Sequence, residues 1–448
     1  MTPIAPTMRG GAMHAQKTPT HASRRLWGAQ LQQPMPAATR FDRIAFIIGT
    51  ASAVWLAVII GIQGVRSPWA WLLFIPVWAI VAYLALPRLH RMLSDLYVPD
   101  YFFGRTRTGD GLLGDPVNLG VDGTAAQLDT VMTDAGWHRA DEITAAATWG
   151  IIVSTLTRRS YPTAPVSPLM LFGRRHDVAY QQEVAGNPKQ RHHVRFWHTP
   201  EGWLLPGGAR TDWLGAGTYD TDVGLSFFTL QVTHRIDENT DVERDFVVDS
   251  VRTAAPEAGV RVLKDFTTGY HSRNGGGDRF VTDGDLPILD LTRVSAGHHP
   301  SLAPLAPGET PTASDVMRRM PLSIVAGALL VILLGALQIA SVLFDPDTWS
   351  AVSGVNEAER IVVIGVVGVF TALTGVQIVL AVLVLRRGRR SRAVLIVLVA
   401  LGIVFVATDY LDGSATLGLN ATLFTASAQC IALLALSSDS AGAWVRRA

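Results

Sequence analysis

Six long runs of apolar residues with almost no charge constrain this chain more than any other feature of its sequence. The runs cover residues 44–64, 69–86, 322–344, 361–385, 393–410 and 417–437. Each approaches or exceeds the roughly 20 apolar residues that a helix needs to cross the hydrocarbon core of a bilayer. Several runs are apolar all round, which argues against the amphipathic surface helices of a soluble protein. The pattern predicts an all-α transmembrane region of six helices.

Positive charge is concentrated on one side of these predicted spans, with Arg66 as the exception on the other side. The flanking arginines on the charged side are Arg24, Arg25, Arg40, Arg43, Arg88, Arg91, Arg318, Arg319, Arg386, Arg387, Arg389, Arg390, Arg392, Arg446 and Arg447. Loops that carry many arginines stay in the cytoplasm during membrane insertion. We therefore expect a multi-pass protein of the cell inner membrane, with both termini and the long segment between spans two and three in the cytoplasm.

The spans divide the chain into six parts. Residues 1–42 are rich in Pro, Ala and Gln and contain no signal peptide, so we expect a disordered cytoplasmic tail. The predicted parts that follow are a transmembrane helical hairpin at 43–87, a folded domain at 98–292, a linker at 293–320, a four-helix transmembrane region at 321–438 and a cytoplasmic tail at 439–448.

The segment 98–292 mixes short strands with a few helices. Helical spacing of apolar residues predicts helices at 124–135, 142–158 and 242–254, the third with Thr240 or Asp241 as its N-cap. Strands are predicted at 169–172, 178–184, 192–198, 203–206, 213–220, 225–234 and 260–266, and the folded part is expected to end with 280–291. Because strands outnumber helices and no βαβ repeat is present, we predict an α+β cytoplasmic domain inserted in the six-helix transmembrane region.

The run RHHVRFW at 191–197 carries the most chemistry in this domain. In a strand, alternation places His193, Arg195 and Trp197 on one face, and His192, Val194, Phe196 and His198 on the other. Arginine and histidine together suit an anionic group such as phosphate. The predicted anion-binding residues are His193, Arg195, Trp197, Arg174, Arg175 and His234. The alternative is a basic strand edge that is solvated or faces anionic lipid.

A metal site is a weaker interpretation of the same region. Imidazole and carboxylate ligands suit a transition metal, and the set would be His193, Asp220, His234 and Asp237, although their spacing is not diagnostic. The sequence identifies no cofactor. Cys430 is the only cysteine, which excludes a disulfide within the chain. The formal net charge of +1 gives no support for a nucleic-acid partner.

Polar residues within the predicted spans are few. The notable ones are Gln338, Gln377, Asn420 and Gln429. In a transporter they would line a path across the membrane, and the alternative is hydrogen bonding between helices. No charged residue lies in the middle of a span, which favours the second interpretation.

Six separated motifs in the domain, spread over about 100–291, resemble those of one family. They are DGLLGDPVNLGVDGT at 110–124, DAGWHR at 134–139, YPTAPVSPLMLFG at 161–173, RHHVRFW at 191–197, GTYDTDVGL at 217–225 and THRIDENTDVERD at 233–245. Together and in this order they are similar to the LssY C-terminal domain. In that family the domain often follows a type-2 phosphatidic acid phosphatase domain, so the resemblance implies a context of membrane lipid phosphates.

The resemblance does not extend to phosphatase chemistry. The phosphatase signature needs a P-S-G-H run, and the nearest piece, SAGHHP at 295–300, lacks the proline and falls in the predicted linker. The sequence therefore favours a binding or accessory module over an enzyme, without deciding between them. The expected partners are membrane lipids and either a lipid phosphate or a membrane phosphatase. A hydrolase acting on a phosphorylated lipid or small molecule is the second hypothesis, and a transporter is the third.

Overall fold

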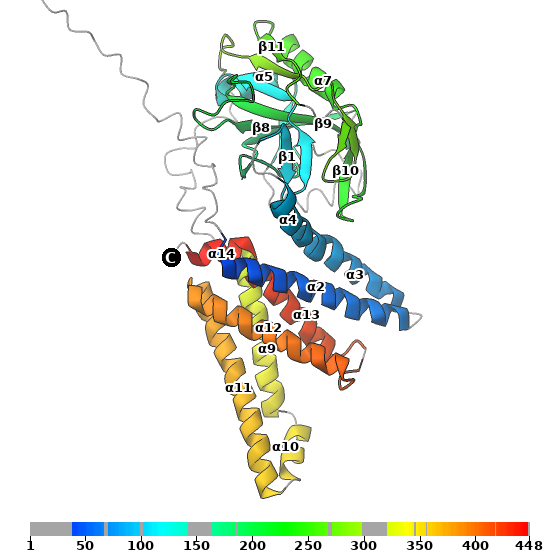
Figure 1. Cartoon of the computed structure of the whole chain (residues 1–448), viewed down its shortest axis with the longest axis vertical. Helices are drawn as coiled ribbons and strands as arrows, with labels where there is room; N and C mark the ends of the chain where they lie inside the picture. The colour runs from blue at the N-terminus through cyan, green and yellow to red at the C-terminus, as the bar shows by residue number, and fades with distance from the viewer. Residues whose placement is uncertain are drawn as a thin grey trace, which may run out of the picture.

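The computed structural model describes residues 38–66, 70–98, 102–141, 161, 163–184, 187–267, 271–297, 320–344, 346–354, 356–416 and 418–446. These residues form a bundle of long apolar helices and a β-rich domain that is joined to the bundle by α4 (Leu86–Tyr97) (Figure 1). The predicted helix at 142–158 lies outside the described residues.

The bundle is built from helices that match the predicted spans. Their bounds are α2 (Arg40–Arg66), η1 (Ala70–Leu73), α3 (Phe74–Ile80), η2 (Val81–Ala85), α9 (Leu322–Phe344), α10 (Pro346–Ser353), α11 (Glu357–Leu385), α12 (Arg389–Leu411), α13 (Ala421–Leu436) and α14 (Asp439–Arg446). In the described part of the chain, five helices are long and apolar enough to cross a membrane, or six if α13 and α14, bent by 54°, count as one. The short helix α10 was not predicted.

The predicted boundary between the four-helix region and the C-terminal tail differs from the structure. The segment 439–448 was predicted as a tail, but its residues 439–446 form α14, which packs against α9, α12 and α13. Buried Asp42 holds this end together, because Arg392 donates to its Oδ1 at 2.6 Å and Arg446 pairs with its Oδ2. Sequence periodicity could not detect a contact between residues 404 positions apart.

The described residues of the domain form three sheets. Its strands are β1 (Arg105–Thr108), β2 (Leu113–Pro116), β3 (Leu119–Asp122), β4 (His138–Arg139), β5 (Leu169–Leu171), β6 (Arg174–Arg175), β7 (Val178–Val184), β8 (Asn187–His198), β9 (Trp213–Leu225), β10 (Val232–Ile236), β11 (Gly259–Leu263), β12 (His271–Arg273), β13 (Arg279–Val281) and β14 (Leu286–Asp290). Its helices are α5 (Ala125–Asp134) and α7 (Thr240–Ala254).

The largest sheet has the order β11-β14-β3-β9-β8-β7-β4, with β10 paired to β9. All of its pairings are antiparallel except β14 with β3. A second sheet has the order β2-β1-β5-β6, and β12 pairs with β13. This mixed topology confirms the predicted α+β class for the domain.

Two separate cores lie on the two faces of the large sheet. On one face, α5 and α7 pack over Val194 and Phe196 of β8, with Met132 and Val251 among the helix residues buried there. On the other face, the apolar part of the core contains Trp197 and Leu214 from the large sheet and Leu169 and Leu171 from the smaller one. The large sheet is therefore buried on both sides, as in a three-layer arrangement.

Two predicted helices are confirmed, with one correction at a cap. Helix α5 begins with a capping box in which the side chains of Thr124 and Gln127 each accept from the other residue's backbone N–H. Helix α7 is capped by Asn239, whose side chain accepts from the N–H of Asp241. Thr240 and Asp241 were the predicted caps. Asp241 instead pairs with Arg244 at 3.1 Å, a contact that requires the folded helix.

Two predicted strands are wrong. Residues 203–206 form a loop, in which Leu205 donates its N–H to Ala209 across a turn. Residues 225–234 are not one strand, because the chain reverses at 226–231 between β9 and β10. Leu230 adopts a left-handed φ of 57°, which no continuous strand contains. Apolar and aromatic content alone predicted a strand here, but this content belongs to the tip of a hairpin.

Close packing of β9 against its neighbours predicts unequal tolerance at two glycines on the same face. A Cβ on Gly215 would lie 2.8 Å from Cε1 of Phe196 and 3.0 Å from Cβ of Leu119, whereas one on Gly217 would meet nothing closer than 3.6 Å. We expect Gly215→Ala to reduce the free energy of unfolding by about 1–3 kcal/mol through overpacking. The matched control Gly217→Ala should change it by less than about 1 kcal/mol. Thermal unfolding of both variants in detergent measures the difference, and equal Tm values would contradict it.

Candidate functional site

Strand β8 is a central strand of the large sheet, paired with β7 on one side and β9 on the other. Its predicted alternation is present, and both faces are buried. Arg191, His193, Arg195 and Trp197 lie between the two sheets, and His192, Val194 and Phe196 lie under the helices. The alternative of a solvated basic edge is therefore excluded for this strand, because a central strand with two covered faces has no such edge.

A buried carboxylate organises the polar side chains between the sheets. Asp220 of β9 is 3% exposed, and its Oδ1 lies 3.4 Å from Nδ1 of His193. Its Oδ2 lies 3.4 Å from a terminal guanidinium nitrogen of Arg191 and 3.6 Å from Nδ1 of His234. We call Asp220, Arg191, His193, His234, Gln181 and Thr218 the Asp220 cluster.

The remaining hydrogen bonds fix the orientation of these side chains. Arg191 donates to Oε1 of Gln181 at 3.1 Å, and Nε2 of His193 is 2.8 Å from the hydroxyl of Thr218. Arg191 also approaches Nε2 of His234 at 3.0 Å. Arginine can only donate, so Nε2 of His234 accepts and the proton of this neutral ring is on Nδ1. Its N–H then faces Asp220.

Arg195 joins the two sheets beside this cluster. Its guanidinium donates to Asp115 of β2 at 3.1 Å and to the carbonyl of Ser167 at 3.1 Å. Arg105 of β1 lies in the same layer, and donates to the hydroxyl of Ser272 at 2.8 Å. Both arginines and Asp115 are buried. A buried pair of this kind is strongly disfavoured when one member is removed, since the other charge is then uncompensated.

Comparison with known proteins assigns this domain to a family. Residues 96–286 match the family model described as LssY C-terminus. The β-rich domain is an LssY C-terminal domain. The match includes β8, β9 and β10, which contribute the charged residues of the Asp220 cluster, and it stops before the helices α9 to α14. No curated protein and no solved structure gives a significant match to the chain.

Burial perturbs the titration of this cluster in the LssY C-terminal domain. Burial raises the pKa of Asp220 to about 7, although Arg191 and Arg195 oppose the shift. Burial, together with the nearby arginines, lowers the pKa of His234 to about 4 and holds the pKa of His193 well below its usual range. The cluster at neutral pH therefore contains two neutral imidazoles around a carboxyl group that titrates near pH 7.

The cluster has unmet hydrogen-bonding capacity at three nitrogens. Nδ1 of His193, Nδ1 of His234 and Nε of Arg191 are buried and have no hydrogen-bond partner among the described residues. Such atoms are uncommon in proteins and cost free energy. The side chain of His234 is 33% exposed, whereas those of Arg191, His193 and Asp220 are 9%, 5% and 5% exposed. His234 is therefore the point at which the cluster meets solvent.

Not all predicted anion-binding residues join this cluster. Arg174 pairs with Asp177 and donates to the carbonyl of His198. Trp197 is fully buried in the apolar core, with its ring centroid 6.1 Å from that of His176. Arg175 is half-buried on β6, in the smaller sheet. Of the predicted set, the structure brings His193 and His234 together around Asp220, with Arg195 beside them.

Gln181 and Thr218 are members of the cluster that sequence reasoning missed. Arg191 belongs to the arginines that the sequence groups with the histidines of the domain, but it was not in the predicted anion-binding set, although it shares the face of His193 by alternation. Gln181 and Thr218 could not have been found in this way, because they lie opposite His193 only through the register of β7 and β9. Strand register is a property of the tertiary fold.

A second polar contact lies on the helix face of β8. Nδ1 of His192 is 2.6 Å from Oε2 of Glu243 on α7, and its ring stacks on Phe246 at 4.1 Å. Burial raises the pKa of Glu243, an effect that His192 opposes. Glu243 lies in the first turn of α7, so this contact ties the helix to the central strand.

The weak metal alternative is not assembled. Among the residues that the structure describes, no group of three or more His, Cys, Asp and Glu side chains is placed to hold a metal ion. His193, Asp220 and His234 are neighbours, but Asp237 follows β10 and its Oδ1 accepts the N–H of Asn239 at 2.8 Å.

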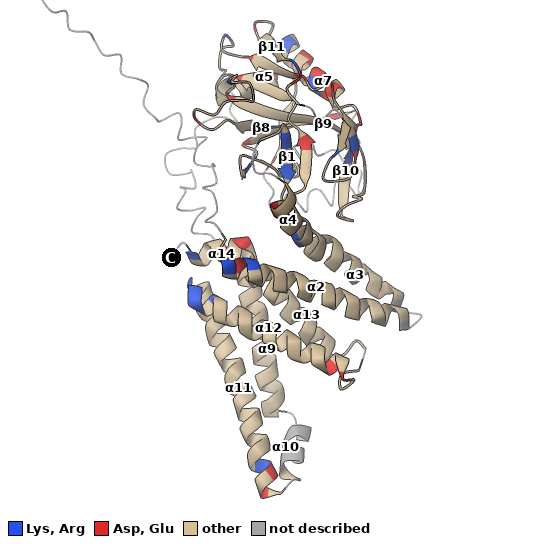
Figure 2. Cartoon of the chain, in the orientation of Figure 1, with Lys and Arg blue, Asp and Glu red and all other residues tan. Residues whose placement is uncertain are grey.

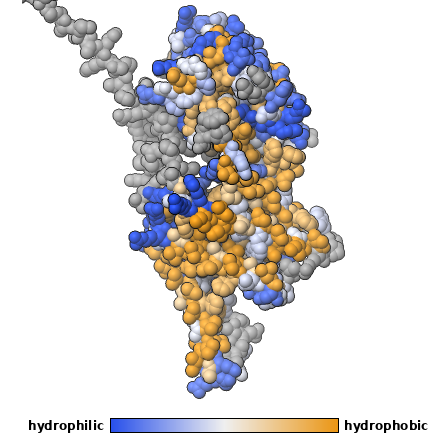
Figure 3. All heavy atoms as spheres, in the orientation of Figure 1, coloured by the Kyte–Doolittle hydropathy of each residue, from blue (hydrophilic) through white to orange (hydrophobic). Residues whose placement is uncertain are grey.

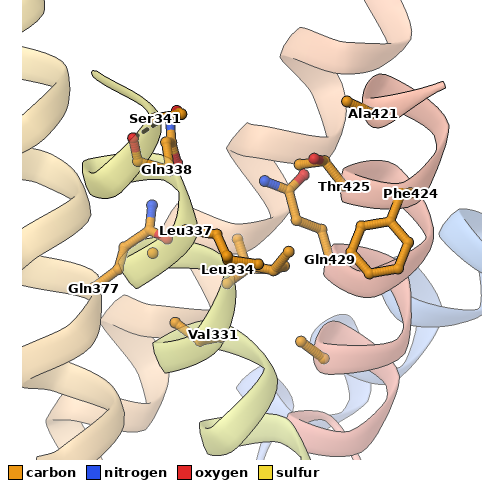
Figure 4. A pocket seen from close by; sticks show the side chains of 13 residues that line it. Val331, Leu334, Leu337, Gln338, Ser341, Gln377, Ala421, Phe424, Thr425 and Gln429 are labelled. Carbon is orange, nitrogen blue, oxygen red and sulfur yellow. Dashed lines mark hydrogen bonds between the residues drawn. The ribbon is translucent and has the colours of Figure 1, made fainter. Parts of the chain in front are cut away.

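The helices contain a separate cavity of about 350 Å³ between α9, α11, α12 and α13. It is lined by three of the four polar residues noted in the spans, namely Gln338, Gln377 and Gln429. Figure 4 shows Gln377 on α11 and Gln429 on α13, with Gln338 on α9 between them. The lining residues carry no charged side chain, so the cavity suits a neutral group.

The raised pKa of Asp220 predicts a pH-dependent effect of Asp220→Asn. The folded state holds a proton on Asp220 that the unfolded state loses above about pH 4, so this stabilisation is present at low pH and is lost as pH rises through about 7. The unfolding free energy of the wild type relative to Asp220→Asn should therefore fall by about 1 kcal/mol between pH 6 and pH 8. Histidine titration largely cancels in this difference.

Thermal unfolding of the full chain in detergent at several pH values measures this difference. Asp212→Asn, which removes an exposed carboxyl group before β9, is the control and should show no such trend. A Tm difference between the wild type and Asp220→Asn that does not change with pH would refute the raised pKa.

Proposed function

We propose that this chain is a multi-pass membrane protein whose LssY C-terminal domain lies at the cytoplasmic surface of the bilayer. Support comes from the five long apolar helices, or six with the bent pair, in the described part of the chain. Their outward surface is largely apolar, in contrast to the hydrophilic far end of the domain (Figure 3). Apolar surface on this scale suits contact with lipid.

The proposed orientation is supported by where the arginines lie. Figure 2 places charged residues at the ends of α2, α12 and α14, while the middle of each helix is free of them. Helix α2 begins at Arg40, α12 begins at Arg389 and α14 ends at Arg446. The domain follows α4 on this same side of the bundle (Figure 1). The positive-inside rule makes this side cytoplasmic.

For the domain itself we propose the binding of a phosphate group, as an accessory module for lipid phosphates. The observation that carries this proposal is a buried arginine, Arg191, with an unpartnered Nε, next to the partly exposed His234. Guanidinium and imidazole N–H groups are suited to phosphate oxygens. Arg195 is already satisfied by Asp115 and Ser167, so we assign it the role of holding the two sheets together.

A binding role fits the surroundings of the cluster better than rapid turnover does. Its members other than His234 are less than 10% exposed, which leaves little room for a substrate to reach Asp220 and leave again. A membrane phosphatase that supplies the reactive groups is the protein partner that such a module would serve. The lipid itself would be presented by the bilayer.

Phosphate binding should be tested with phosphatidic acid in phosphatidylcholine vesicles and with soluble glycerol phosphate, using the full chain. We expect His234→Ala and Arg191→Gln each to weaken binding about tenfold or more, because each removes a hydrogen bond to a charged group. The matched controls are His198→Ala on the exposed end of β8 and Arg235→Gln on the exposed side of β10, and both should bind as the wild type does.

Comparing binding of phosphatidic acid vesicles with binding of glycerol phosphate shows whether the bound anion is a lipid headgroup or a free phosphate compound. Binding should also weaken as pH rises above about 7, because ionised Asp220 repels an anion. Equal binding by His234→Ala and the wild type, with equal Tm values, would remove the proposed site. Arg191→Gln alone is not decisive, since removing a buried charge also costs stability.

A hydrolase is the second hypothesis, and one observation favours it. A carboxyl group with a pKa of about 7 between two neutral histidines is an arrangement suited to general acid–base catalysis. Release of inorganic phosphate from the same ligands, lost in His193→Ala and kept in His198→Ala, would replace the accessory role with an enzymatic one. A transporter is the third hypothesis, and the cavity between Gln338, Gln377 and Gln429 is the feature that favours it.

A further inference from the structure

The tip of the β9–β10 hairpin, residues 225–232, is apolar and exposed. Its sequence is LSFFTLQV, and Phe227 is 77% exposed. Leu225, Leu230 and Val232 are exposed as well, at 55%, 41% and 55%. A cluster of large apolar side chains at the end of a hairpin is disfavoured in water and marks a surface that contacts a partner or lipid.

This tip does not point into solvent away from the bundle. The indole N–H of Trp78 on α3 donates to the carbonyl of Leu230 at 3.0 Å. The N–H of Val232 donates to the hydroxyl of Tyr83 in η2 at 3.3 Å. The loop end of β10 accordingly lies beside α3 in Figure 1. The hairpin therefore docks on the second predicted span.

The hairpin docks where the helical hydrogen-bond pattern is interrupted, at η2 and Pro87. In the π-helical turn η2, the N–H of Leu86 bonds to the carbonyl of Val81. The carbonyl of Ala82 is then left without a helical donor, because the next residue, Pro87, has no N–H. Nε2 of Gln231 donates to this carbonyl at 2.8 Å. Within a bilayer an unpaired carbonyl is strongly disfavoured, and Gln231 supplies the missing donor.

The docking point lies deeper than the charged end of the helix. Trp78 precedes Arg88 by ten residues, which corresponds to about 15 Å along a helix. Arg88 donates to the hydroxyl of Ser437 at 3.0 Å and Arg91 pairs with Asp439, so these arginines mark the polar end of the bundle. A tip that reaches Trp78 extends past this level toward the apolar middle of the span.

Several backbone N–H groups of the tip are hydrogen-bonded within the protein, as an apolar environment requires. The N–H of Ser226 donates to Gln231 O at 2.8 Å, and that of Leu230 to Ser226 O at 3.0 Å. The N–H of Thr229 donates to the Ser226 hydroxyl at 3.0 Å, and that of Phe227 to Gly276 O at 3.0 Å. Polar backbone groups that are paired within the protein are what lipid contact requires.

We propose that residues 225–232 form a membrane-inserted hairpin, which binds the acyl region of the domain-side leaflet and docks on η2 through Gln231. The inference rests on the proposed membrane insertion of the helices, but not on phosphate binding.

A membrane-inserted tip also sets the depth of the Asp220 cluster relative to the bilayer. His234 is four residues beyond Leu230 along the hairpin, or about 13 Å of strand. His234 therefore lies nearer to the domain-side surface of the proposed bilayer than the tip does.

Spin labels on the full chain test this proposal. In a Cys430→Ala background, single cysteines replace Phe227 at the hairpin tip, Val242 on α7 and Val369 in the middle of α11. Val242 and Val369 are matched controls, because they are apolar and 64% and 59% exposed. The protein is reconstituted in vesicles of phosphatidylcholine and phosphatidylglycerol, and collision of each label with oxygen and with a water-soluble nickel chelate is measured.

We expect the label at residue 227 to collide with the chelate roughly tenfold less often than the label at 242, because a polar chelate is excluded from hydrocarbon. The label at 369 should behave like that at 227. Equal chelate access at 227 and 242, with 369 protected, would overturn the hairpin inference alone. Chelate access at all three positions would overturn the proposed membrane insertion of the helices as well.

A second variant tests the docking contact. Adding Gln231→Leu to Phe227→Cys leaves the Ala82 carbonyl without its donor, so the label should become more mobile and more accessible to the chelate. An unchanged label in this double variant would refute Gln231 as the docking residue.

Discussion

A carboxylate buried between two sheets is the feature on which the domain's polar interior depends. Asp220 is 3% exposed, and removing a carboxyl group from water has a large free-energy cost unless charges or donors compensate it. Arg191, His193 and His234 lie around it within 3.4–3.6 Å, and their positions follow from three adjacent strands. The compensation is incomplete, which is why burial still raises the pKa of Asp220 to about 7.

The two faces of β8 divide structural and chemical roles between them. On the helix face, Val194 and Phe196 supply the apolar core, while the His192–Glu243 contact ties α7 in place. On the inter-sheet face, Trp197 is apolar packing, Arg195 bridges to Asp115, and His193 belongs to the Asp220 cluster. One seven-residue run thus serves both layers, because successive side chains of a strand point to opposite sides.

The domain and the helices are joined at more than the covalent connection through α4. Gln231 pairs with the Ala82 carbonyl that the π-helical turn η2 and Pro87 leave free, so the break in the helical hydrogen bonds becomes the contact point of the hairpin. The same hairpin carries His234 on β10 and Asp220 on β9.

The sequence by itself determined the apolar helices, the α+β class, the position of α5 and α7, and the alternation of RHHVRFW, because periodicity and composition are local properties. It also contained the six motifs of the LssY C-terminal domain. Only the tertiary structure decided that both faces of β8 are buried and that Arg191, Gln181 and Thr218 join His193, since strand register and sheet layering bring together residues far apart in the chain. The hairpin tip shows the same limit. Its apolar residues predicted a strand at 225–234, whereas they form a turn that contacts a helix about 150 positions earlier.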